Sequence, residues 1–188
     1  IEARPLTLDE AFRMEPRLSR HIISAYAVPD AAIDGFRMSC QNVASAVRYG
    51  GRYKTYAEVV GIQEKNGELE GVRVRNRFSG EEYDIACDIL VNAAGGWCEK
   101  VAELAGLNVP VQPDKGTLIA FNQRLASHVV NRLHKPSDGD IFVPHGSITI
   151  LGTTSMSIDD PEDTSSSYEE IEALMKIGEE TFEDLRCY

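Results

Sequence analysis

The pattern of apolar and polar positions predicts four helices. In the second, Phe36, Val43 and Val47 share one stripe at helical spacing, and Gly50 follows as a stop signal. The first opens on a Thr-Leu-Asp-Glu run, a capping box in which the hydroxyl and the carboxylate each accept a backbone N–H. The expected helices are a short one between Thr7 and Pro16, and longer ones over 34–49, 98–105 and 168–185.

Between the second and third helices the apolar period changes to two, which is typical of strands with one buried face. Val72 and Val74 alternate with arginines, while an Asn-Gly turn at Asn66 precedes them and a Ser-Gly turn at Ser79 follows. These signals predict a three-stranded antiparallel meander over 59–86. A further antiparallel sheet is expected beyond Pro113, from strands at 116–122, 127–133, 140–144 and 147–152.

The segment 89–91 is apolar at every position, which is typical of a central parallel strand covered on both faces. It leads into the small residues Ala93, Ala94 and Gly95. Small residues at the carboxyl end of such a strand let a flat cofactor approach the backbone, although a plain strand-to-helix turn gives the same pattern. Neither a G-x-G-x-x-G nor a G-x-x-x-x-G-K-[ST] motif occurs, so any dinucleotide site is represented only in part. The strands and helices together predict a mixed α/β (α+β) fold.

Composition excludes several classes of function. No apolar run approaches the ~20 residues of a membrane-spanning helix. Much of the net charge of −11 lies in 155–188, where eleven acidic residues face only Lys176 and Arg186, and such an acidic helix is usually a solvated face. Without a basic stripe, nucleic acid is not an expected partner. The four cysteines and four histidines lack metal-ligand or redox spacing, so reduced thiols and no metal site are expected.

Two polar residues at strand boundaries are candidate ligand contacts. Lys115 precedes Gly116 at the head of a strand, where its ammonium can face an anion, and Thr154 closely follows a strand end. Both also fit plain structural roles, a solvated lysine and a hydrogen-bonded turn. His145, in an expected hairpin turn, is the best placed of the histidines, and no residue stands out as a general base.

Several motifs resemble those of FAD-dependent glycerol-3-phosphate dehydrogenases in both order and spacing, and the resemblance covers essentially all 188 residues. A Lys-Pro-Ser-Asp segment is most similar to the anaerobic type of this enzyme, in its A chain. The motifs are Val28-Pro29-Asp30, Ile33-Asp34, Phe36-Arg37, Ile89 to Gly95 with Trp97, Lys115-Gly116, Lys135-Pro136-Ser137-Asp138, Ile141-Phe142-Val143-Pro144 and Leu151-Gly152-Thr153-Thr154.

The wider family is that of the D-amino-acid-oxidase-like flavoproteins. There a glutathione-reductase-type FAD domain is interleaved with an antiparallel-sheet substrate domain. The resemblance implies that residues 1–33 and 107–188 belong to the substrate domain. It assigns 34–106, including the meander, to the FAD domain.

The resemblance also implies an activity, the oxidation of sn-glycerol 3-phosphate to dihydroxyacetone phosphate. FAD would take the hydride, and sister subunits would pass electrons to a quinone at the cytoplasmic side of the inner membrane. Val59 would contact the adenine through its backbone, and Ala93, Ala94 and Gly95 would lie beside the flavin. Lys115 and Thr154 would line the substrate side.

The chain departs from the family pattern because the glycine-rich FAD fingerprint and the later arginine segment for substrate phosphate are absent. It also begins at Ile1 without a methionine. We therefore expect an internal fragment that is inactive alone, binds FAD weakly or not at all, and either self-associates or covers its exposed strand edge with its first and last helices. Two alternatives remain: an amino-acid oxidase of the same superfamily, and a non-catalytic interaction module with an acidic helix.

Overall fold

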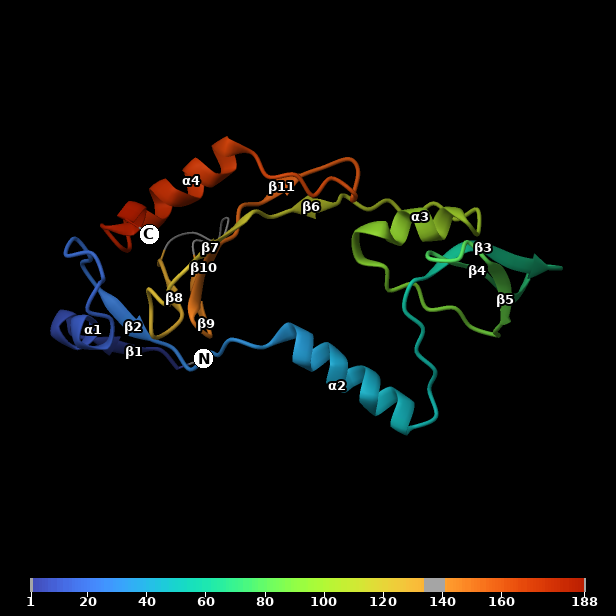
Figure 1. Cartoon of the computed structure of the whole chain (residues 1–188), viewed down its shortest axis with the longest axis horizontal. Helices are drawn as coiled ribbons and strands as arrows, with labels where there is room; N and C mark the ends of the chain where they lie inside the picture. Colours follow the sequence, from blue (N-terminus) through green and yellow to red (C-terminus); the bar gives the residue numbers. More distant parts are fainter. Residues whose placement is uncertain (1, 134–140, 188) are drawn as a thin grey trace. The chain divides into compact units, whose positions relative to one another are not determined.

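The computed structural model describes residues 2–133 and 141–187 and divides the chain into two compact units (Figure 1). The first unit combines residues 1–33 with 114–188, and the second comprises 34–113. Residues 107–113 thus belong with the second unit, whereas the sequence prediction ended the FAD portion at 106. All strand pairs in the described residues are antiparallel, and helices accompany them, so the fold is mixed α/β with antiparallel sheets.

The first unit is built on a four-stranded sheet in the order β7-β10-β9-β8. This confirms the predicted second sheet, with shorter strands. The hairpin between β9 and β10 turns at Gly146, where φ is +59°, so His145 ends a strand instead of lying in the turn. The strands are β7 (Leu118–Phe121), β8 (Val130–Asn131), β9 (Ile141–His145) and β10 (Ile148–Gly152).

Two short strand pairs in this unit have no counterpart in the sequence prediction. β1 (Arg4–Leu6) pairs with β2 (Ala25–Ala27), and β6 (Asp114–Lys115) pairs with β11 (Met156–Ser157). Strands of two or three residues are too short to show a period in the sequence.

Helix α1 (Leu8–Met14) lies between β1 and β2 in the sequence. Its capping box is confirmed: the Glu10 N–H donates to the Thr7 hydroxyl at 3.2 Å, and the Thr7 N–H donates to the Glu10 carboxylate at 2.8 Å. The helix ends at Met14, and its C-cap Glu15 directly precedes Pro16, as predicted.

Helix α4 (Tyr168–Glu179) packs on the sheet and helps close the main core. The prediction of one helix over 168–185 is wrong in its last part. The helix ends at Glu179, and a turn brings Phe182 and η2 (Leu185–Cys187) back into the core. Gly178 permits this return because a Cβ at its position would lie 2.6 Å from the Leu185 side chain and 2.8 Å from that of Leu151, which is too close. The core residues are Phe121, Leu125, Ala126, Phe142, Leu151, Leu174, Phe182 and Leu185.

The second unit contains the predicted meander, formed by β3 (Ala57–Lys65), β4 (Glu68–Asn76) and β5 (Glu82–Ala86). Asn66 and Gly67 make its first turn with φ of +54° and +83°. Val72 and Val74 are buried on one face, as their alternation with arginines predicts. On the other face, arginines of β4 pair with acidic residues of β5.

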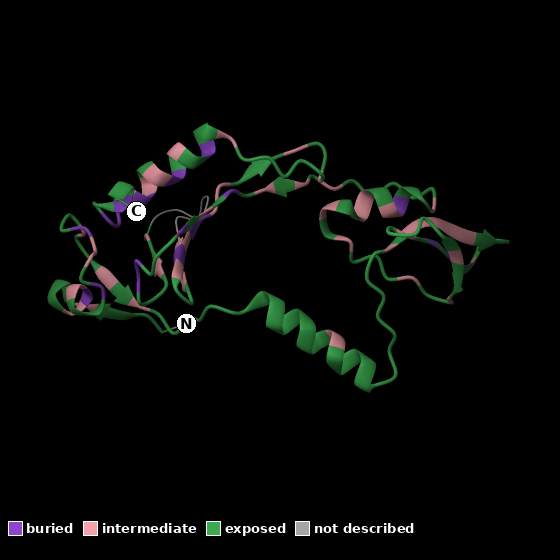
Figure 2. Cartoon of the chain, in the orientation of Figure 1, coloured by how far each residue is buried: buried purple, intermediate pink, exposed green. Residues whose placement is uncertain are grey.

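Helix α2 (Gly35–Arg48) is also confirmed, with the Asp34 carboxylate accepting the Arg37 N–H at 3.0 Å as an N-cap. No residue of this helix is buried, and Phe36 on its apolar stripe is 88% exposed. Figure 2 shows α2 as exposed along almost its whole length. Of the stripe that predicted the helix, only Val43 is half-buried, and no residue of the stripe is fully buried.

The predicted parallel strand at 89–91 does not form. These residues lie outside every helix and strand, and Ile89 and Val91 are 80% and 79% exposed. The physical reason is that the described part of the chain offers them no neighbouring strand, and a strand needs a hydrogen-bonding partner. The next helical segments do form: η1 (Gly95–Trp97) leads into α3 (Cys98–Glu103), and Gly106 follows with φ of +68°.

Candidate functional site

The small-residue turn after residue 91 is held by one asparagine. The Asn92 side chain donates to the Cys98 carbonyl at 2.9 Å and accepts the Ala94 N–H at 3.3 Å. Gly95 has φ of +57°, and no atom outside its chain neighbours lies within 4 Å of the position that a Cβ would take. Ala93 and Gly95 are exposed, so the turn presents bare backbone to open space. This arrangement fits the approach of a flat ring system such as a flavin.

Val59 lies in β3, an edge strand of the meander and part of the same unit as the turn. It pairs with Val74, and the register shifts between Val59 and Gly61. An edge strand leaves part of its backbone N–H and C=O groups without strand partners, and a bulge changes where they point. The outer edge of β3 therefore carries backbone groups without a strand partner in the meander, and the adenine contact of Val59 stays a prediction.

The predicted substrate residues Lys115 and Thr154 both lie in the first unit, on two neighbouring segments. The β6–β11 pairing and a hydrogen bond from the Thr117 N–H to the Thr154 hydroxyl, 2.9 Å long, join these segments. Gly116 allows them to approach closely, since a Cβ there would lie 2.0 Å from the Thr153 hydroxyl oxygen. The other predicted motif of this unit, Lys135-Pro136-Ser137-Asp138, lies outside the described residues.

The Lys115 ammonium faces the loop that precedes α4. It donates to the Ser165 carbonyl at 2.8 Å and lies 3.4 Å from the Asp163 carboxylate. Its side chain is only 16% exposed. The Ser165 hydroxyl and N–H, with help from Lys115, hold the pKa of Asp163 below its ordinary value. In this conformation Lys115 therefore ties the loop down, and an anionic ligand would have to share or replace these contacts.

Glu170 is a buried residue that sequence reasoning missed. Its carboxylate accepts hydrogen bonds from the Thr117 hydroxyl at 2.9 Å, the Thr154 hydroxyl at 3.2 Å and the Ser167 N–H at 2.9 Å. The Ser167 N–H, followed by the Thr117 hydroxyl, lowers the pKa of Glu170. The Ser-x-x-Glu capping box at Ser167 is the signal that could have placed Glu170 in the first turn of a helix. Nothing in the sequence could have shown that it reaches the two threonines.

The lowered pKa of Glu170 gives a testable pH dependence. The ionised form is favoured in the folded protein, so its contribution to stability is present above the ordinary carboxyl pKa of 4.5 and is lost as pH falls through the lower folded value. We expect the stability of wild type minus that of Glu170→Gln to shrink as pH is lowered below about 4.5. Urea unfolding of both proteins between pH 3 and 7 measures this difference. A difference that is constant over this range would contradict the assignment.

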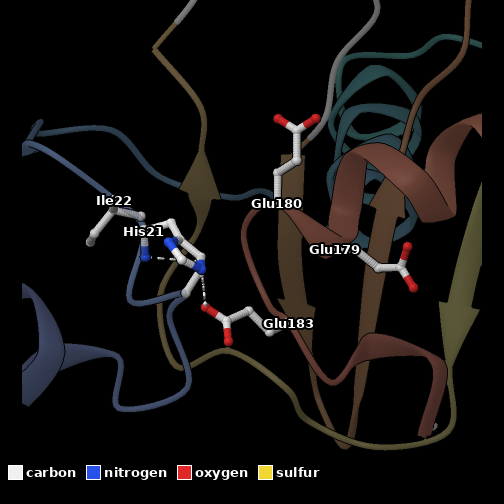
Figure 3. Close-up of a pocket in the computed structure, with 6 residues that line it drawn as sticks. His21, Ile22, Glu179, Glu180 and Glu183 are labelled. Atoms are coloured by element: carbon white, nitrogen blue, oxygen red, sulfur yellow. Dashed lines mark hydrogen bonds and ion pairs between the residues drawn. The ribbon is translucent and has the colours of Figure 1, made fainter.

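One pocket in the first unit contains none of the predicted site residues (Figure 3). It has a volume of about 460 Å³ and is lined by Ser19, His21, Ile22, Glu179, Glu180 and Glu183. The Glu183 carboxylate accepts from the Ser19 hydroxyl at 2.8 Å and from the Arg20 N–H at 2.9 Å, and the hydroxyl is the main cause of its lowered pKa. Glu179 forms an ion pair with Arg186, and Glu180 forms one with Arg132. No group of metal-ligating side chains suited to a metal ion occurs in the described residues.

The model of a protein family described as FAD dependent oxidoreductase matches residues 1–187. The chain belongs to this family. The resemblance inferred from the sequence motifs is thereby confirmed.

Within residues 2–133 and 141–187, no helix has the length and apolar character needed to cross a membrane.

Within this family, the chain is similar in sequence to subunits of glycerol-3-phosphate dehydrogenases. The chain is 38% identical to the A subunit of the anaerobic glycerol-3-phosphate dehydrogenase of Escherichia coli strain K12, over 95% of this chain and 33% of the relative. It is also 38% identical to the corresponding A1 subunit of Haloferax volcanii, over 94% of this chain and 32% of the relative. The chain therefore spans about a third of the length of these relatives.

Solved structures agree on the fold. The glycerol-3-phosphate dehydrogenase from Bacillus halodurans complexed with FAD has a TM-score of 0.81 at 21% identity, covering 98% of this chain and 40% of that one. Glycine oxidase from Geobacillus kaustophilus has a TM-score of 0.74 at 23% identity, covering 99% and 48%. At these identities the likeness shows the fold and not the substrate.

Proposed function

We propose that the chain is part of the catalytic subunit of an FAD-dependent dehydrogenase that oxidises sn-glycerol 3-phosphate to dihydroxyacetone phosphate. The observation that carries this proposal is the 38% identity over nearly the whole chain to the A subunits of two anaerobic glycerol-3-phosphate dehydrogenases. The amino-acid oxidase alternative is supported only by structural likeness to two glycine oxidases, at 23% and 20% identity. By the same relationship, sister subunits would pass the electrons to a quinone at the cytoplasmic side of the inner membrane.

Within this proposal residues 34–106, which lie in the second unit, are part of a glutathione-reductase-type FAD domain. Residues 1–33 and 107–188 form the substrate domain; of these, 107–113 lie in the second unit and the others make up the first. FAD, when bound, supplies the acceptor for the substrate's hydride. Ala93, Ala94 and Gly95 leave room for its flavin ring, and the open space at Gly95 supports this role.

The roles proposed for Val59, Lys115 and Thr154 follow from the same relationship to the dehydrogenases. Val59 contacts the adenine through the free edge of β3. In the substrate domain, Lys115 and Thr154 lie on adjoining segments and line the substrate side, with the lysine cation offsetting phosphate charge.

A chimera tests the proposed function directly. Residues 1–187 of this chain would replace the matching segment of the Escherichia coli relative, and the unaltered relative is the control. We expect dye reduction that depends on sn-glycerol 3-phosphate and does not occur with glycine or proline. Oxidation of an amino acid would favour the oxidase alternative. A folded chimera that retains FAD but oxidises none of these substrates would favour the non-catalytic module.

The isolated chain should be colourless as purified. It contains the small-residue turn and β3, but no glycine-rich loop at a helix N-terminus to bind the diphosphate. Cofactor contacts would thus be limited to two places. Absorbance at the flavin band after gel filtration with added FAD measures retention, and a stoichiometric yellow complex would contradict the prediction.

In the chimera, Gly95→Val should lower the flavin content at least about tenfold, because the branched side chain would fill the space proposed for the ring. Gly80→Val is the matched control. Gly80 also has a positive φ, +73°, and open space at its Cβ position, so backbone strain is present in both variants. Equal flavin loss in the two variants, measured per folded protein, would show that Gly95 only makes a turn.

A further inference from the structure

The side chain of Thr154 has one hydrogen-bonding position left open, and this limits what it can bind. Its hydroxyl accepts the Thr117 N–H at 2.9 Å and donates to the Glu170 carboxylate at 3.2 Å. A hydroxyl group has one proton and two lone pairs. Within residues 2–133 and 141–187, these two contacts therefore use the proton and one lone pair, and the second lone pair stays open. Thr154 is half-buried, so part of its surface is accessible to a ligand.

Glu170 determines the direction in which the Thr154 proton points. It is only 5% exposed, and its carboxylate also accepts the Thr117 hydroxyl and the Ser167 N–H, each at 2.9 Å. These two contacts lower its pKa, so the carboxylate is ionised at neutral pH. An ionised carboxylate has no proton to donate, so Thr154 must be the donor in the contact between them. Toward a ligand, the Thr154 hydroxyl can therefore act only as an acceptor.

An acceptor suits some groups of a ligand and not others. An alcohol group carries a proton that it can donate, whereas phosphate oxygens at neutral pH are mainly acceptors. A phosphate oxygen at the open lone pair of Thr154 would have no proton to share with it. The Lys115 ammonium, on the neighbouring segment, is a cation and suits phosphate. The two candidate substrate residues thus differ in the group that each can bind.

We propose that Glu170 is a positioning residue that makes Thr154 selective for the terminal hydroxyl group of the substrate. This inference rests on the proposed oxidation of sn-glycerol 3-phosphate. The substrate phosphate lies at Lys115, and the terminal hydroxyl donates to Thr154. The reacting hydroxyl is a poorer match, because it loses its proton during oxidation and needs a base with a pKa near the working pH, which a threonine hydroxyl is not.

The test uses the chimera with the Escherichia coli relative and two ligands. One is sn-glycerol 3-phosphate, and the other is its deoxy analogue, which has a methyl group in place of the terminal hydroxymethyl group. Calorimetry with the flavin chemically reduced measures both affinities without turnover. We expect the unsubstituted chimera to bind sn-glycerol 3-phosphate at least about fivefold more tightly than the analogue, as one hydrogen bond would give.

Variants of two residues separate recognition from folding. Thr154→Val should reduce the preference to less than about twofold, and Thr154→Ser, which keeps the hydroxyl, should retain it. Glu170→Gln should also reduce it to less than about twofold, although the Thr154 hydroxyl is still present. The amide of this variant can keep its oxygen on the Ser167 N–H and donate its NH₂ to Thr154, which releases the threonine proton toward the ligand.

Glu183→Gln is the matched control. The Glu183 carboxylate also accepts a serine hydroxyl and a backbone N–H, at 2.8 Å and 2.9 Å, but it makes no contact with Thr154. The same change of charge there should leave the preference unchanged. If Glu170→Gln does not fold, the pair Thr154→Val and Thr154→Ser still decides whether a hydroxyl is bound at this position.

Several results would overturn the proposal. If Thr154→Val keeps the preference, or weakens the binding of both ligands equally, Thr154 does not bind the terminal hydroxyl. If Glu170→Gln keeps a preference that Thr154→Val loses, Glu170 has no positioning role. A chimera that binds neither ligand also contradicts it. Dye reduction by the same chimera is measured separately: turnover without the preference refutes only this inference, and the preference without turnover refutes only the proposed dehydrogenase activity.

Discussion

Phe142→Ala is expected to destabilise the first unit by about 3–5 kcal/mol, as removal of a fully buried aromatic side chain usually does. Phe142 is fully buried and meets the Phe182 ring edge-on, with centroids 4.7 Å apart. It also lies against Gly178, so its loss opens a cavity between β9 and α4. A typical domain is stable by only about 5–15 kcal/mol, and this single change therefore removes a large part of the total.

Urea unfolding measured by circular dichroism tests this expectation, with Phe78→Ala as the control. Phe78 is 77% exposed and contacts chiefly the Tyr56 ring, 4.2 Å away, so its truncation should cost less than about 1.5 kcal/mol. Equal destabilisation by the two substitutions would contradict the core described above. The two substitutions also lie in different units, Phe78 in the second and Phe142 in the first, so each one reports on the stability of its own unit.

Features determined by local interactions were predictable from the sequence. The capping box at Thr7 and the N-cap at Asp34 each depend on residues within one helical turn, and both helices begin where expected. The Asn66-Gly67 turn likewise requires only that both residues tolerate positive φ. The meander followed from this turn and from the alternation around Val72.

Features determined by distant partners were not predictable. The apolar run at 89–91 has the pattern of a buried strand, but a strand forms only where another strand pairs with it. The end of α4 was missed for a related reason. Its apolar spacing continues past Glu179, but Phe182 and Leu185 reach the core by a turn that depends on Gly178 and on the sheet below it.

In the candidate site, too, local features were predictable and contacts between distant residues were not. The small-residue turn could be located from sequence because Ala93, Ala94 and Gly95 are contiguous. The contacts of Lys115 and Thr154 could not, since they involve Ser165 and Glu170, which are far away in the chain. The structure also shows that both candidate side chains already have partners, which the sequence could not reveal.

The isolated chain should self-associate, with an apparent mass that rises with concentration. Fully burying a large apolar side chain is worth about 1.5–3 kcal/mol, so leaving Phe36, Ile89 and Val91 uncovered forgoes roughly 5–9 kcal/mol. That is comparable with the stability of a whole domain. An unpaired backbone at 89–91 is also a template for pairing with another chain.

The alternative cover, by the first and last helices, stays a prediction. Both helices already bury apolar residues within the first unit, Leu174 of α4 and Ala11 of α1. Light scattering over a hundredfold dilution series is the direct measurement. Val91→Lys should bring the mass closer to 20.8 kDa at every concentration, because an ammonium at that position opposes burial against another chain. A wild-type chain that remains at this mass throughout the series would show that the exposed surface is tolerated in water, and the energetic argument from Phe36, Ile89 and Val91 would fail.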